Sequence, residues 1–127
     1  MDSKFISHVK ALKSQLANLL AMSPVTPTTL PHKMPLKGIY LFSEDGRHLY
    51  VGRSNNIKNR INHHARNSAD HHKATFAFLL AREATGNVKP TYSKGNKSRS
   101  ALMEDENFVT EFEHAKQRIQ KMNLRFI

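Results

Sequence analysis

The chain has 127 residues, which suits one domain with a short extension and allows a modest hydrophobic core. It contains no cysteine, so a disulfide framework and a cysteine-ligated zinc site are excluded. It also lacks a signal-peptide apolar segment and any apolar run long enough to span a bilayer, and we therefore expect a soluble cytoplasmic protein that does not enter membranes.

The charge is strongly basic, with 20 Lys and Arg against 10 Asp and Glu, and it is unevenly distributed. Residues 37–100 carry twelve basic and four acidic side chains, residues 1–36 carry four and one, and residues 101–127 carry four and five. A concentrated positive field favours nucleic acid, because neutralised phosphates release condensed counterions. A solvated surface or an affinity for acidic lipid is the alternative. We favour nucleic acid because the same middle segment holds the unusual polar residues.

The first predicted element is an amphipathic helix over residues 3–22. Its apolar side chains recur at helical spacing and are Phe5, Val9, Leu12, Leu16, Leu19 and Leu20. We expect this helix to dock on the domain, on a protein partner or on a second copy. The proline-rich residues 23–35 then form a linker or a loop across the domain surface. Residues 1–36 are thus predicted to be a helix and linker, and residues 37–127 the main domain.

A hairpin is predicted next, because two β-rich runs, KGIYLF and HLYVG, flank an Asp-Gly turn. With the turn centred on Asp45, Tyr40 lies opposite Tyr50 and Gly38 opposite Gly52. The other face carries only aliphatic side chains and is predicted to be core; these are Ile39, Leu41, Leu49 and Val51. The glycines let a ligand or another backbone approach the tyrosine face closely.

A helix is predicted over residues 57–65, after Ser and Asn residues suited to capping. Ile57 and Ile61 define its inward stripe, and Arg60 and His64 lie at or beside that stripe as an i, i+4 pair. A guanidinium beside a buried stripe is costly unless a partner satisfies it, so the pair indicates function. For His64, a capped, hydrogen-bonded helix histidine is nearly as well supported as a phosphate contact or a proton donor.

The remaining segments predict a helix over residues 74–84, a basic loop, helical regions over residues 99–105 and 107–122, and a final strand, LRFI. Four histidines at positions 63, 64, 71 and 72 do not suit one zinc ion, because neighbours on a helix project about 100° apart. We interpret them as part of a polar or DNA-contacting segment.

The hairpin and the helix after it resemble the signature of the GIY-YIG nuclease superfamily. Gly38-Ile39-Tyr40 matches the first triplet, Tyr50-Val51-Gly52 matches the second, Arg60 follows ten residues after Tyr50, and His64 lies one turn further. The resemblance implies an α+β fold with a small three-stranded antiparallel sheet flanked by helices. Here an N-terminal amphipathic helix and a helical insertion before the last strand are added to it. It also implies a metal-dependent endonuclease that hydrolyses DNA with Mg²⁺ or Mn²⁺.

The resemblance also implies roles for single residues. Tyr40 is the general base, Tyr50 orients the water and the scissile phosphate, Arg60 binds that phosphate, and His64 completes the set. We expect DNA, or alternatively RNA, to contact residues after the second triplet and in the basic loop: Gly52, Arg53, Ser54, Lys58, Lys94, Lys97 and Arg99. The alternatives are a tyrosine pair that only stabilises the sheet and an ordinary solvated loop.

One part of the signature is missing from the sequence. In the family a glutamate on a helix after the third strand holds the metal. This sequence stops at Ile127, which is the last residue of the predicted strand LRFI. We therefore expect a domain that is incomplete at its C-terminus, and we assign no metal ligand. Either the sequence is truncated, or another carboxylate substitutes, or the protein is a binding module that no longer cleaves nucleic acid.

Overall fold

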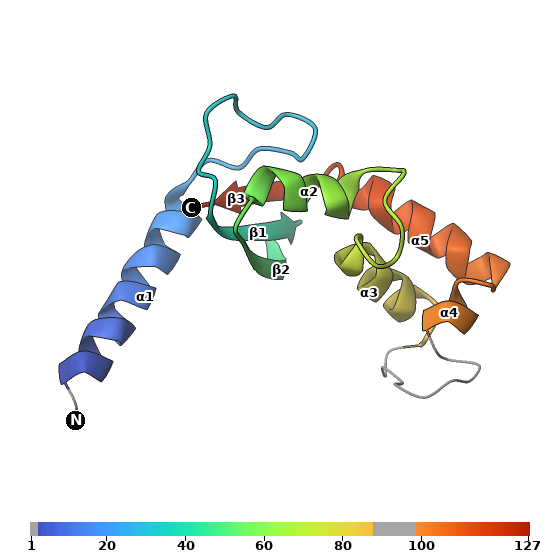
Figure 1. The fold of residues 1–127 in the computed structure, drawn as a ribbon, viewed down its shortest axis with the longest axis horizontal. Helices are drawn as coiled ribbons and strands as arrows, with labels where there is room; N and C mark the ends of the chain where they lie inside the picture. Colours follow the sequence, from blue (N-terminus) through green and yellow to red (C-terminus); the bar gives the residue numbers. More distant parts are fainter. Residues whose placement is uncertain (1–2, 88–98) are drawn as a thin grey trace. The chain divides into compact units, whose positions relative to one another are not determined.

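The computed structural model describes residues 3–87 and 99–127 (Figure 1). The chain divides into two compact units. The first comprises residues 1–58 and 122–127 and contains helix α1 (Ser3–Ala21) and the sheet. The second comprises residues 59–121 and contains helices α3 (Thr75–Ala84), α4 (Arg99–Leu102) and α5 (Glu106–Ile119). Helix α2 spans Ile57–Ala65, as predicted.

The sheet has three antiparallel strands in the order β2-β1-β3. They are β1 (Gly38–Glu44), β2 (Arg47–Ser54) and β3 (Asn123–Phe126). The hairpin strands are adjacent in sequence, whereas β3 joins the other edge of β1 from the far end of the chain. The predicted three-stranded antiparallel sheet and the C-terminal strand are therefore confirmed.

The hairpin turn is tighter than predicted, and the predicted register is wrong. Asp45 and Gly46 both have positive φ, 52° and 77°, which gives a two-residue turn whose twist matches that of the strands. Tyr40 pairs with Gly52 and Phe42 with Tyr50, while Ser43 pairs with His48, so Leu49 is an extra residue in β2. The two-residue turn together with this bulge displaces the pairing by two residues from the register predicted by centring the turn on Asp45.

The predicted core face is also wrong in part. Tyr40, Phe42 and Leu124 share the aromatic face, and all three are buried. On the aliphatic face Leu41 is buried, but Val51 is 62% exposed. The larger rings fill the interior because they remove more apolar surface from water than the aliphatic chains do.

Helix α1 contacts the rest of the first unit through its last turns. Leu19 is buried, whereas Ile6, Leu12, Leu16 and Leu20 are exposed. The proline-rich segment is a loop held on the sheet, because Val25 and Leu124 exchange two backbone hydrogen bonds of 2.9 and 2.7 Å. Docking of α1 on the domain is thus confirmed near Leu19, and its association with a partner stays a prediction. None of the described helices has both the length and the apolar character needed to cross a membrane.

The second unit has an aromatic core between α3 and α5. The ring of Phe78 lies 5.1 Å from that of Phe108 and 6.5 Å from that of Phe112, measured between centroids. Helix α5 begins after Asp105, whose carboxylate accepts hydrogen bonds from the backbone N–H groups of Asn107 and Phe108 and so caps the helix.

A buried lysine attaches α5 to the segment that follows α2. Lys116 is 1% exposed, and its ammonium group donates to the backbone carbonyls of Asn67 at 2.6 Å and Ala69 at 3.0 Å. It also pairs with Glu113 at 3.0 Å. Gln120 donates to the carbonyl of Ala65 at 2.6 Å. Residues 65–69 are therefore held at several points by side chains of one helix.

Candidate active site

The two signature tyrosines lie on the same face of the sheet. Tyr40 on β1 pairs with Gly52, and Tyr50 lies diagonally from it on β2. Their ring centroids are 6.4 Å apart with an angle of 31° between the planes. The edge of Phe42 also contacts Tyr40, at 5.9 Å between centroids. The two phenols are therefore neighbours, although they are not directly opposite each other.

Gly52 makes room for the ring of Tyr40. A Cβ atom at position 52 would lie 2.8 Å from Cε1 of Tyr40, and closer still to its Cζ and Oη atoms. The phenol therefore lies across β2 at the point where every other residue would carry a side chain. Glycine at the end of the second triplet sets where the hydroxyl of Tyr40 lies.

Gly38 in the first triplet has a different neighbour. Its Cβ would collide with the carbonyl group of Ile127, and its φ of +153° also disfavours an L side chain. Ile39 and Ile127 exchange two backbone hydrogen bonds of 2.9 Å at the same place. Both glycines thus permit close approach, as predicted, and here the approaching groups belong to the protein itself.

The tyrosines differ in their access to solvent. Tyr40 is 1% exposed, whereas Tyr50 is only partly buried. A general base must reach a water molecule, so the role implied for Tyr40 requires movement around its hydroxyl. Tyr50 needs no such movement to meet a substrate.

Arg60 is oriented by two acceptors in the second unit. Its guanidinium donates to the carbonyl of Lys73 at 3.1 Å and to the hydroxyl of Thr75 at 2.9 Å. These bonds use two of the five N–H groups of an arginine side chain, and Arg60 remains partly exposed. The cost of placing a guanidinium beside the buried stripe is therefore met by protein acceptors. The convergence of Arg60 with the two tyrosines stays a prediction.

His64 is fully buried and lies edge-on to Phe76, with the ring centroids 6.4 Å apart. Burial is the main cause that lowers its pKa to about 3, and the charges of Arg60 and His63 add to the effect. A phosphate contact, or a proton donated near neutral pH, would require movement around this imidazole, as it does around the hydroxyl of Tyr40. The phosphate contact or proton donor and the capped, hydrogen-bonded helix histidine therefore both stay predictions for this residue.

The residues expected to contact nucleic acid differ in exposure and in their contacts within the protein. Lys58 is exposed, whereas Arg53 pairs with Ile39 and so projects from the face opposite the tyrosines. The hydroxyl of Ser54 accepts a hydrogen bond from the N–H of Asn56 in the turn before α2. Arg99 donates to the carbonyl of His71 at 2.6 Å and stacks on Phe78 at 4.2 Å. Lys94 and Lys97 lie outside the described residues.

Sequence reasoning missed the residues that position Arg60. Thr75 is fifteen residues further along the chain, and Lys73 contributes its backbone carbonyl, which no side-chain pattern reveals. Arg66 and Lys73 counted only towards the net charge, although they line a pocket with His63. The concentration of basic residues between positions 58 and 73 was the one signal available.

A family model described as the GIY-YIG catalytic domain matches residues 36–122, more than half of the chain. The chain belongs to the GIY-YIG family. The predicted resemblance is confirmed, and the three-stranded sheet with its flanking helices is the fold expected of a GIY-YIG domain. The match supports a nuclease-type function with nucleic acid as the partner. No curated protein and no solved structure matches the chain.

GIY-YIG nucleases typically depend on a divalent metal, which needs several donor side chains close together. Within residues 3–87 and 99–127, no three or more His, Asp or Glu side chains are grouped in a way that suits a metal ion. The described carboxylates of the first unit are Glu44 and Asp45 at the hairpin turn. Glu44 is four residues from Tyr40 along β1, or roughly 13 Å. These donors do not fit a metal site beside the tyrosines, and no ligand is assigned.

Proposed function

We propose that this GIY-YIG protein is an endonuclease that hydrolyses phosphodiester bonds in DNA. The observation that carries the proposal is the arrangement of Tyr40, Tyr50 and Gly52 on one face of the sheet. Two neighbouring phenol rings, with centroids 6.4 Å apart, suit a reaction in which both hydroxyls act on one water molecule and one phosphate. Membership of a nuclease family supplies the reaction type.

In the proposed reaction Tyr40 is the general base. The oxygen of a water molecule attacks phosphorus as its proton passes to the Tyr40 phenolate, and the bond from phosphorus to the leaving oxygen breaks. A leaving alkoxide then takes a proton from solvent. A phenol has an ordinary pKa of about 10, so the reaction needs nearby positive charge that favours the phenolate. Tyr50 would orient the attacking water and the phosphate.

Arg60 is the proposed phosphate clamp. Its bonds to Lys73 and Thr75 fix the plane of the guanidinium before substrate arrives, and its remaining N–H groups are free of these two bonds. Guanidinium groups bind phosphate through two parallel hydrogen bonds. A donor fixed in advance stabilises the charge that develops in the transition state without reorganisation at that moment.

Supercoiled plasmid tests the proposal. We expect the purified chain to nick plasmid with Mg²⁺ or Mn²⁺ and to stop when a chelator is added. Tyr40→Phe and Arg60→Ala should each lower the rate by about 100-fold or more. Arg47→Ala is the matched control, because it removes an exposed arginine from the far end of the hairpin. Loss of nicking in the control as well as in Arg60→Ala would contradict the assignment of Arg60.

The second candidate is a nucleic-acid-binding module with this fold and no cleavage. The specific observation in its favour is the burial of Tyr40, which keeps the proposed base from water in this conformation. For such a module the plasmid stays intact under all metal conditions. It is nevertheless retained by the protein, and the retention weakens as salt is added.

A further inference from the structure

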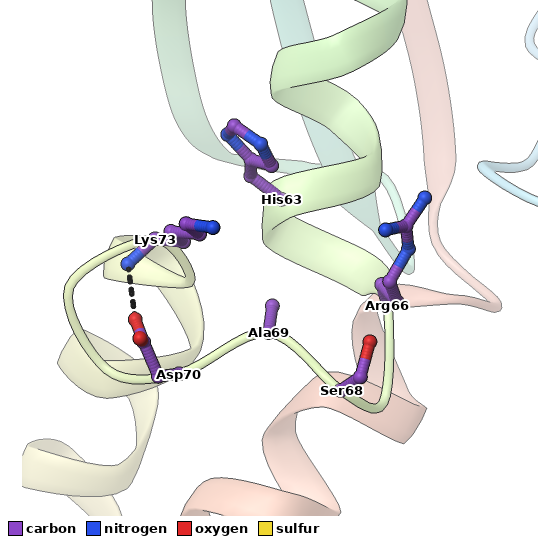
Figure 2. Close-up of a pocket in the computed structure, with 6 residues that line it drawn as sticks. All are labelled: His63, Arg66, Ser68, Ala69, Asp70 and Lys73. Carbon is purple, nitrogen blue, oxygen red and sulfur yellow. Dashed lines mark hydrogen bonds between the residues drawn. The ribbon is translucent and has the colours of Figure 1, made fainter.

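A small polar pocket lies between the end of α2 and the start of α3 (Figure 2). Its volume is about 90 Å³, and it is lined by His63, Arg66, Ser68, Ala69, Asp70 and Lys73. In the view of Figure 2, His63 and Lys73 stand on one side of Ala69, and Arg66 and Ser68 stand on the other. The lining thus brings the cations Arg66 and Lys73 to one pocket.

Three of the lining side chains are basic, and one is acidic. The carboxylate of Asp70 accepts hydrogen bonds from the backbone N–H groups of His72 at 3.0 Å and Lys73 at 3.1 Å. These bonds hold the turn that leads into α3 and lower the pKa of Asp70. Arg66 and Lys73 make no ion pair with it among the salt bridges between described residues. The pocket thus keeps a net positive charge.

The electrostatics at His63 reflect the same charges. Partial burial is the first cause that lowers the pKa of His63, and the cations Lys73, Arg60 and Arg66 are the next causes. Three positive groups therefore act on one imidazole, and Asp70 opposes them only weakly. An anion placed among these groups would be attracted by all of them.

The loop that contributes Ser68 and Ala69 to the pocket is held by Lys116 of α5 and by Gln120, the residue after that helix. Lys116 donates hydrogen bonds to the backbone carbonyls of Asn67 and Ala69. Gln120 donates to the backbone carbonyl of Ala65 and to the side-chain oxygen of Asn67. The loop therefore does not need to be ordered by a ligand, which lowers the entropy cost of binding. Arg60 is attached to the same place, because its guanidinium donates to the carbonyl of Lys73.

We propose that Arg66 and Lys73 of this pocket bind a backbone phosphate of DNA. The inference rests on the proposed function and adds a substrate contact to it. The pocket lining offers the guanidinium of Arg66 and the ammonium of Lys73, which are the groups that bind the oxygens of a phosphate. Contacts of this kind fix the register of a nucleic acid without reading its sequence.

Binding of a labelled DNA duplex in the presence of a chelator tests the pocket apart from cleavage. Arg66→Ala and Lys73→Ala remove the two cations, and Lys73→Ala leaves the backbone carbonyl that holds Arg60 in place. Lys121→Ala is the matched control, because Lys121 is exposed in the same unit and does not line the pocket. Fluorescence anisotropy at several salt concentrations gives both the Kd and its salt dependence.

We expect each pocket variant to raise the Kd by about 5- to 20-fold and to reduce the slope of log K against log salt by about 1. Lys121→Ala should change the Kd by less than about twofold. Arg66→Lys should recover most of the salt slope but only part of the affinity, because lysine lacks the paired donors of arginine.

Pocket variants that bind like Lys121→Ala would overturn the proposal, even if the plasmid is cleaved. Absence of duplex binding by the unmodified chain would overturn it as well. Weaker binding by the pocket variants alone would support it, even if the plasmid stays intact and the endonuclease proposal fails. Displacement of the duplex by inorganic phosphate beyond the effect of chloride at equal ionic strength would assign the pocket to free phosphate, and would overturn the role in DNA binding.

Discussion

Single atoms decide the geometry of the tyrosine face. The hydroxyl and the ring of Tyr40 occupy the place where a side chain at position 52 would begin, so Gly52→Ala forces either the ring or β2 to move. We expect a loss of about 1–3 kcal/mol in the free energy of unfolding, measured by urea denaturation. Val51→Ala, at an exposed neighbour in the same strand, should cost less than about 0.5 kcal/mol. Equal losses in the two variants would mean that Tyr40 does not depend on Gly52.

His64 makes a prediction about pH. Its pKa is about 3 in the folded chain and 6.5 when unperturbed. Between these values the unfolded chain binds a proton that the folded chain does not. The contribution of His64 to the free energy of unfolding is therefore complete above pH 6.5. As the pH falls below that value, the free energy of unfolding decreases by about 1.4 kcal/mol per pH unit. The lowered pKa values of His63 and His71 act in the same direction.

Urea denaturation between pH 5 and about pH 7 measures this slope while most carboxylates stay ionised. In His64→Phe we expect the slope to fall by about 1 kcal/mol per pH unit, whatever the change in absolute stability. Val51→Ala, at an exposed position without a titratable side chain, should keep the original slope. An unchanged slope in His64→Phe would show that this histidine is not buried as a neutral group.

Among the secondary-structure elements, the hairpin shows what sequence patterns predict and where they fail. Period-two alternation and the Asp-Gly step predicted both strands and the turn, because these signals are local. The register depended on the bulge at Leu49, which no local residue preference marks. The choice of core face failed because burial depends on what packs against the sheet. Tyr40 and Phe42 are buried, whereas Val51 is exposed.

Helix α1 provides a matched pair of leucines that differ in burial. Leu19 is 3% exposed and Leu12 is 62% exposed. Leu19→Ala should lower the free energy of unfolding by about 2–4 kcal/mol, because it removes a buried side chain and leaves a cavity. Leu12→Ala should cost less than about 0.5 kcal/mol in the isolated chain. Chemical denaturation at two protein concentrations tests both. A large, concentration-dependent effect of Leu12→Ala would instead show that this face contacts a second copy.

Helix α5 and the loop after α2 are coupled through Lys116. Lys116→Met keeps most of the apolar stem but leaves the carbonyls of Asn67 and Ala69 without their donor. We expect a loss of about 2–4 kcal/mol, because a buried acceptor without a partner carries its full desolvation cost. Lys121→Met, at an exposed site near the end of the same segment, should be within about 0.5 kcal/mol of the unmodified chain. Similar losses in both variants would contradict the bonds to the loop.

Across the whole molecule, the sequence predicted the family and its fold but not the surroundings of the candidate site. The two triplets and Arg60 lie within a short segment, so their spacing is visible in the sequence. The acceptors of Arg60 come from residues 73 and 75, and the donors to residues 65–69 come from residues 116 and 120. Contacts over such separations arise from tertiary packing, and a single sequence does not encode them in any local pattern.

The uneven charge of the chain makes a last prediction. If residues 37–100 contact DNA, substitutions that remove their positive charges should reduce the number of counterions released when DNA binds. The cations on α1, by contrast, contribute only to the net charge. Lys58→Gln combined with Arg66→Gln should reduce the slope of log K against log salt by about 1.8. Lys10→Gln combined with Lys13→Gln removes the same charge from exposed sites on α1 and should change the slope by less than about 0.5. Duplex binding measured over a salt series compares the two. Equal slopes would show that total charge, rather than its placement along the chain, governs binding.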